Sequence, residues 1–104
     1  MSDEHANVAK YAKTPVHEAA VNGLAKTYRL VLHNMDTRYV ACSDPAERDR
    51  IRENFLKKKL GLDGDDLDDV IMSVCQKMKG DRLKSRLTFY YLLAEHYGRL
   101  DEFA

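Results

Sequence analysis

Hydrophobic residues recur at helical spacing along most of this chain. The clearest stripe follows the spacing i, i+3, i+4, i+7, which places every apolar residue on one helix face. The run from Leu87 to Ala94 is apolar on nearly every side, so its helix must be covered on more than one side. That helix is predicted to be the centre of the domain or to share its outer face with a partner. The residues of the regular stripe are Leu67, Val70, Ile71, Val74, Cys75 and Met78.

Capping residues set the limits of the predicted helices. Thr14-Pro15 is typical of a helix start, and Asp44-Pro45 with Glu47 resembles a capping box. Gly61 and Gly98 suit the left-handed position that ends a helix. In the last helix, Asp81 is the predicted cap. The predicted helices cover about 3–12, 15–33, 45–60, 67–79 and 82–97.

These segments predict a single all-α domain over residues 1–104. Its architecture is a compact bundle of four main helices plus a weaker N-terminal one, with the last two helices forming a hairpin. The segment 36–43 could be a short extended piece or one helical turn. Because no partner strand is evident elsewhere, we interpret it as a packed connector.

Composition narrows the range of functions. The 17 basic and 17 acidic side chains cancel, which argues against a nucleic-acid coat or a polybasic membrane anchor but not against a local basic patch. The longest apolar stretch is far below the ~20 residues of a membrane span. No secretory signal is evident, so a cytoplasmic location is expected.

The two cysteines, Cys42 and Cys75, fit no metal-binding spacing. A disulfide between them is conceivable, but buried reduced thiols are the favoured interpretation.

The stretch from Lys77 to Arg86 is the main candidate for function. Basic residues stabilise the C-terminus of a helix and oppose its N-terminus. Lys77 and Lys79 obey that rule, whereas Arg82, Lys84 and Arg86 would open the next helix against it. A glycine turn before a helix N-terminus is a natural anion site. The candidate anion-binding residues are Lys77, Lys79, Arg82, Lys84, Ser85 and Arg86.

Other interpretations of this stretch stay open. It could be a solvated charge run, a protein contact, or the turn of a DNA-binding helix-turn-helix.

The aspartates of 63–69 fail the spacing of a calcium loop and suit the start of the following helix. Acidic and basic poles at opposite ends of the hairpin would favour oriented, salt-sensitive association.

Chemistry-bearing motifs are scarce. The four histidines show no metalloprotease spacing, and neither a phosphate loop nor a nucleophile elbow is present. We therefore expect no enzyme activity, no cofactor and no metal.

Four blocks of the chain resemble a known family. They are Cys42–Glu47, Asn54–Gly61 and Lys77–Arg82, with a fourth stretch from Lys84 to Gly98. They resemble the small bacterial proteins catalogued as domain of unknown function 2853. The resemblance implies a compact helical bacterial protein and supplies no catalytic or binding residue.

The sequence thus predicts a non-enzymatic interaction or accessory protein. It is expected to bind an unidentified protein partner or to self-associate through the apolar last helix, without contacting a membrane. The alternative is anion or nucleic-acid binding through the hinge 77–86, with nucleic acid the less favoured ligand because the net charge is zero.

Overall fold

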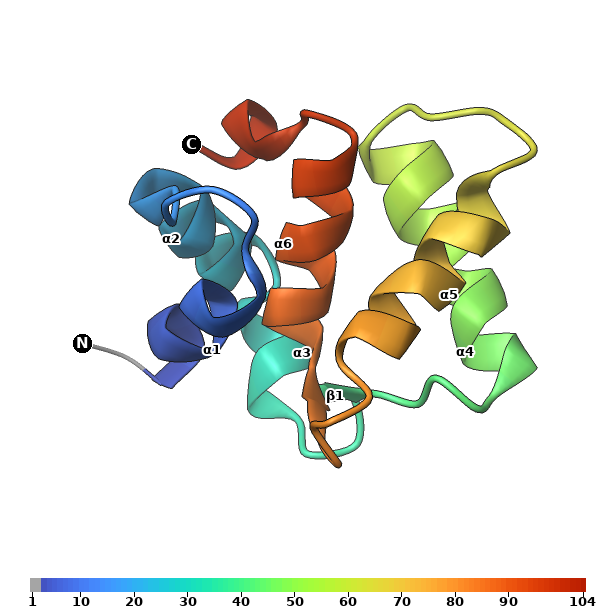
Figure 1. Cartoon of the computed structure of the whole chain (residues 1–104), viewed down its shortest axis with the longest axis horizontal. Coiled ribbons are helices and arrows are strands. Elements are labelled where there is room, and N and C mark those ends of the chain that lie inside the picture. The colour runs from blue at the N-terminus through green and yellow to red at the C-terminus, as the bar shows by residue number, and fades with distance from the viewer. Residues whose placement is uncertain (1–2) are drawn as a thin grey trace.

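The computed structural model describes residues 3–104, and this part of the chain is mostly helical (Figure 1). A short antiparallel pair of strands, β1 and β2, joins the middle of the chain to the start of the last helix. The predicted fold class is confirmed. The elements are α1 (Asp3–Tyr11), α2 (Glu18–Thr27), α3 (Arg29–His33), β1 (Tyr39–Val40), α4 (Pro45–Arg50), the π-helix η1 (Ile51–Lys59), α5 (Leu67–Lys77), β2 (Lys84–Ser85), α6 (Arg86–His96) and the 3-10 helix η2 (Leu100–Phe103).

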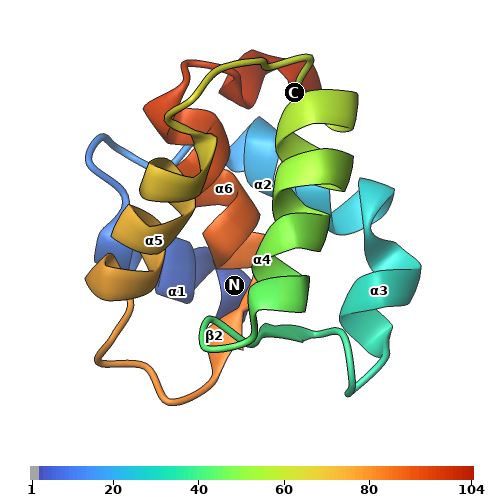
Figure 2. The ribbon, with the colours of Figure 1, turned by 90° about the vertical axis from the view of Figure 1, so that its right-hand side faces the viewer.

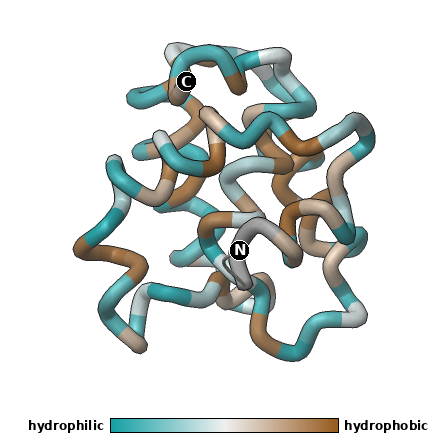
Figure 3. Tube along the Cα trace, turned by 90° about the vertical axis from the view of Figure 1, so that its left-hand side faces the viewer, coloured by the Kyte–Doolittle hydropathy of each residue, from teal (hydrophilic) through white to brown (hydrophobic). Residues whose placement is uncertain are grey.

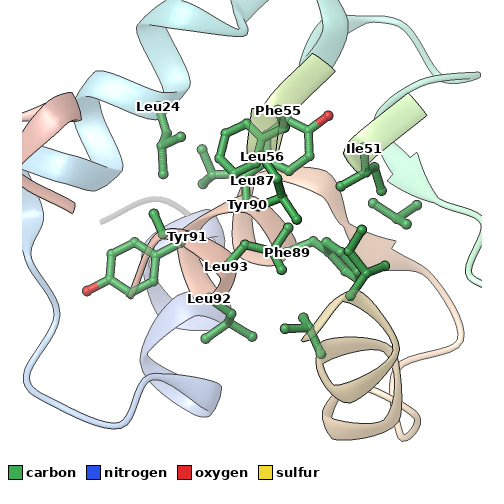
Figure 4. Close-up of a cluster of buried hydrophobic side chains, with 14 of the residues drawn as sticks. Leu24, Ile51, Phe55, Leu56, Leu87, Phe89, Tyr90, Tyr91, Leu92 and Leu93 are labelled. Carbon is green, nitrogen blue, oxygen red and sulfur yellow. The ribbon is translucent and has the colours of Figure 1, made fainter. Parts of the chain in front are cut away.

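Helix α6 is the centre of the structure. Every residue from Arg86 to Ala94 is buried, and α1 and α2 cover one side of the helix while α5 covers another (Figure 1). Its side chains point in several directions into the same core, as Tyr90, Tyr91 and Leu93 show in Figure 4. Because α6 keeps no outer face, the predicted self-association through this helix is wrong.

The strongest local signals in the sequence are confirmed. All six residues of the regular stripe on α5 are buried. Gly61 and Gly98 both have φ of 67°, a left-handed conformation that glycine adopts without steric cost. The weak N-terminal helix also forms, with Val8 fully buried.

The predicted helix over 15–33 is shorter and interrupted. It begins at Glu18, where the His17 side chain accepts a hydrogen bond from the Ala20 amide at 3.2 Å. Thr14 is not the cap and instead donates its hydroxyl to Glu95 at 3.1 Å. The helix stops at Tyr28, whose ring packs edge-on against Tyr90 at 5.0 Å. Packing of this ring into the core, rather than a local breaker, separates α2 from α3.

The helix predicted over 45–60 changes type half-way. Its second part, η1, is π-helical, with the Leu60 amide bonded to the Phe55 carbonyl. Buried Ile51, Phe55 and Leu60 follow one another at spacings of four and five residues. That spacing averages close to the roughly 4.4 residues per turn of a π-helix, in which hydrogen bonds span five residues. The wider turn therefore keeps all three side chains on the face that meets the core.

The connector 36–43 contains a strand with a partner. Tyr39 lies opposite Ser85, and Val40 lies opposite Lys84. The expectation of no partner strand was wrong because two residues per strand leave no alternating pattern to recognise. The pairing attaches the connector to the start of α6.

The two cysteines are joined in a disulfide. Cys42 lies just after β1, Cys75 lies on the buried face of α5, and their Cα atoms are 5.9 Å apart. The interpretation as reduced thiols is therefore corrected. The expected cytoplasmic location rested partly on those thiols, because disulfides are typical of oxidising compartments. That location stays a prediction. In the described part of the chain, no helix is long and apolar enough to cross a membrane.

Gly23 has a structural role that yields a testable prediction. A Cβ at this position would lie 1.5 Å from the Phe103 carbonyl oxygen, so Gly23→Ala must push η2 away from α2. We expect a loss of about 1–3 kcal/mol in unfolding free energy, as for other overpacked sites, measured by urea denaturation. Gly80→Ala is the control, because a Cβ there meets nothing within 4 Å. Equal stability of the two variants would contradict the prediction.

Candidate functional site

The hinge 77–86 differs from its predicted geometry. α5 ends at Lys77 and α6 begins at Arg86, with the Ser85 hydroxyl accepting from the Thr88 amide at 3.4 Å. Arg82 and Lys84 therefore precede the helix instead of opening it. Asp81 is not the cap, because Lys10 and Asn7 donate hydrogen bonds to its carboxylate at 3.0 and 3.2 Å. The Lys10 bond holds the pKa of Asp81 below its ordinary value.

The six candidate anion-binding residues do not form one cluster of free donors. Lys77, Lys79 and Arg82 are exposed. Lys84 is half-buried and donates to the Asp81 carbonyl at 2.9 Å. Ser85 is occupied as the helix cap. Arg86 is buried in an ion pair with Glu47. Three exposed cations are thus left to carry the prediction of anion binding, which remains a prediction.

Neither a recognition helix nor a neighbouring lysine cluster supports anion or nucleic-acid binding by the hinge 77–86. α6 would be the reading helix of a helix-turn-helix, but it is the buried core helix, so that interpretation is wrong. Lys57–Lys59 end η1 at the opposite end of the fold (Figure 1), and the Lys59 ammonium lies 5.7 Å from the centre of the Phe103 ring. The acidic loop 63–66 lies at that same far end, where Tyr97 donates to Asp66 at 3.4 Å. The hinge 77–86 and the acidic loop 63–66 thus lie at opposite ends of the fold (Figure 1), and association through these charges is still a prediction.

Sequence reasoning missed the buried ion pair between Glu47 and Arg86. The side chains are 6% and 8% exposed. Asp44 caps α4 as predicted by accepting from the Ala46 amide at 3.0 Å. Glu47, however, turns away from the cap, and its second oxygen accepts from Arg50 at 2.9 Å. No local signal could reveal this pair, because the partners are 39 residues apart.

Arg86 holds the connector against the core. Its guanidinium donates to the Thr37 and Tyr39 carbonyls and to the Tyr90 hydroxyl. Burial opposes its charge, but Tyr90 and Glu47 together hold the pKa of Arg86 above its ordinary value. Burial likewise raises the pKa of Tyr90. A cavity of about 520 Å³ opens above this network. The hydrogen bonds of Arg86 at the floor of the cavity go to backbone carbonyls of the connector.

The helix that precedes the connector, α3, is unusually exposed. Its five residues include three consecutive apolar ones, Leu30, Val31 and Leu32, and none of the five is buried. Leu30 is 80% exposed, and Met35 just beyond the helix is 68% exposed. In Figure 2, α3 stands apart on the right of the molecule, and in Figure 3 hydrophobic residues lie on the same projection at the left edge.

Shallow grooves flank α3. One, of about 390 Å³, is lined by Ala25 and Leu32 with cationic side chains around them. A second, of about 360 Å³, runs beside Leu30 and Val31. Apolar side chains that project into solvent beside such grooves are typical of a contact surface. The sequence placed these residues within one predicted helix over 15–33, so their exposure was not predicted.

Comparison with known families identifies the family of this chain. A family model described as "Protein of unknown function (DUF2853)" matches residues 3–101. The chain belongs to this family. A search of curated proteins finds no match. Membership in DUF2853 confirms the resemblance seen in the sequence, but it supplies no activity, so function must be argued from the side chains themselves.

Proposed function

We propose that this protein is a non-enzymatic interaction module that binds a protein partner through α3. The observation that carries the proposal is that none of the three consecutive apolar residues of α3 is buried. A helix of five residues is far too short to be stable by itself in water. Association that covers Leu30 and Met35 would remove apolar surface from water, at about 25 cal/mol per Å².

The polar groups of the fold support the same proposal. Arg86, the most deeply buried cation, bonds to backbone carbonyls and to the Tyr90 hydroxyl as well as to Glu47. This network positions the connector and thereby α3. A role in presenting a surface thus accounts for both the buried charges and the exposed apolar groups.

Site-specific photo-cross-linking tests this function. A benzophenone amino acid replaces Leu30 in the full chain, expressed in cells of the source organism. The matched control replaces Met72, which is 47% exposed on α5. We expect a discrete cross-linked product from position 30 and none from position 72, because only the first lies on the proposed surface. Products of equal yield at both positions, or none at either, would refute the proposal.

A second candidate is anion or nucleic-acid binding by the hinge 77–86. It is favoured by Lys77, Lys79 and Arg82, whose side chains are exposed and form no hydrogen bond or ion pair within residues 3–104. It is weakened by the engagement of Ser85 and Arg86 within the fold. Salt-sensitive binding of a labelled DNA duplex that is lost in Arg82→Glu would support it.

A further inference from the structure

We infer that the partner at α3 is an acidic protein segment with apolar anchoring residues. This inference rests on the proposed function and adds the chemistry of the partner. It follows from the charges that surround α3 and from the apolar side chains between them. Both groups belong to α2, α3 and the connector, so one continuous surface presents them.

The cations around α3 have no acidic partner in the described structure. Lys26, Arg29 and Arg38 are exposed, and all three line the groove of about 390 Å³. No hydrogen bond or ion pair within residues 3–104 engages their side chains. Most arginines elsewhere in the same part of the chain are engaged, and Arg82 in the hinge 77–86 is the exception. The engaged ones are Arg48, Arg50, Arg52, Arg86 and Arg99.

No carboxylate lines either groove. The first groove adds only His33 to the three cations and its apolar residues, and the second contains Lys26 and Arg29 beside Leu30. Asp36 of the connector lines the cavity above Arg86, which adjoins α3 at Val31. The charged side chains that line these two grooves are therefore cationic, which attracts an acidic partner and repels a basic one.

Apolar groups distinguish a protein partner from a nucleic acid. Leu32 and Ala25 are half-buried and line the same groove as the three cations. Leu30 and Met35 are exposed. Phosphates would satisfy the cations but would leave these side chains in water, because a duplex presents little apolar surface outside its bases. An amphipathic acidic segment satisfies both sets of groups, as in helix-in-groove recognition.

A second copy of this chain fits the surface less well. Its acidic loop 63–66 carries aspartates, but the flanking Leu67 is buried and Leu62 is half-buried. The acidic η2 likewise buries Phe103. These segments offer charge without an exposed apolar anchor, so the surface matches a different protein better than it matches itself.

Fluorescence anisotropy with a defined peptide tests this inference. The probe is a fluorescein-labelled peptide of about 16 residues, with leucines at helical spacing i, i+3, i+4, i+7 and glutamates elsewhere. We expect saturable binding to the full-length protein with a Kd of about 10–100 μM, in the range of a small transient interface. A peptide with lysines in place of the glutamates is expected not to bind, because the surface is cationic.

Matched variants locate the binding. The pair Arg29→Glu and Arg38→Glu is expected to weaken binding about tenfold or more, and Leu30→Asp by a similar factor. Arg82→Glu is the control, since Arg82 is an exposed arginine without a bonded partner outside α3, and it should change the Kd less than about twofold. All four positions are exposed, so these variants are expected to fold.

Three outcomes would overturn the inference. They are absence of peptide binding, equal effects of the α3 and Arg82 variants, and a labelled DNA duplex that binds through the α3 cations more tightly than the peptide. Concentration-dependent dimerisation in sedimentation velocity, abolished by Leu30→Asp and without peptide binding, would instead identify a second copy as the occupant. Cross-linking from position 30 without peptide binding would leave the interaction function standing and refute only the acidic partner.

Discussion

Glu47→Ala is expected to lower the free energy of unfolding by about 3–5 kcal/mol, because it leaves Arg86 charged and buried without its counter-ion. The pair is almost fully enclosed, and Arg86 also supports two connector carbonyls. Loss of the carboxylate should therefore loosen the connector as well as the core. Chemical denaturation measures the total cost, and amide hydrogen exchange at Thr37 to Val40 measures the local one.

Arg50→Ala is the matched control for this prediction. Arg50 also contacts Glu47, but its side chain is 60% exposed, so its removal should cost less than about 1 kcal/mol. The double variant Glu47→Ala with Arg86→Met removes both buried charges and should cost less than the sum of the two single changes. A loss below about 1 kcal/mol for Glu47→Ala would show that the buried pair is not a main support of the fold.

Reduction of the Cys42–Cys75 disulfide is expected to lower the free energy of unfolding by about 3–4 kcal/mol. The bond closes a loop with a sequence separation of 33 residues, and such a cross-link stabilises a fold by restricting the unfolded chain. Thermal melting with and without a dithiol reductant measures the effect. At roughly 4–8 °C per kcal/mol for a domain of this size, the melting temperature should fall by more than 10 °C.

The variant Cys42→Ala with Cys75→Ala separates this effect from other actions of the reductant. It should melt near the temperature of the reduced protein, and reductant should not lower that temperature further. A native protein whose melting is insensitive to reductant, and which reacts with two equivalents of a thiol reagent after unfolding without reduction, would show that the bond does not form.

The disulfide also helps to hold in place the segment that contains the proposed contact surface, α3. Cys42 lies between β1 and α4, and the Arg48 guanidinium donates to its carbonyl. The segment that carries α3 is thus held at one end by the core packing of Tyr28 and at the other by the strand pair and the disulfide. Peptide binding measured before and after reduction would show whether this support is needed for recognition.

The amino-acid sequence by itself determined the features that depend on local pattern. The stripe on α5 was legible because each apolar residue recurs at the helical period. Gly61 and Gly98 marked helix ends because a left-handed residue is costly for other side chains. Asp44-Pro45 marked the start of α4 because the cap and its amide lie two residues apart. The family was also recognisable, since its characteristic blocks are contiguous in the sequence.

Only the tertiary structure decided the features that depend on distant partners. The basic hinge looked like the start of a helix, but pairing of Lys84 and Ser85 with β1 delays α6 to Arg86. Arg86 then becomes the buried partner of Glu47 instead of an anion ligand. The same dependence on distant contacts hid the disulfide and separated α3 from α2 at Tyr28. A periodic pattern shows which residues prefer burial, but the space available around α6 decides which of them obtain it, and α3 is left outside.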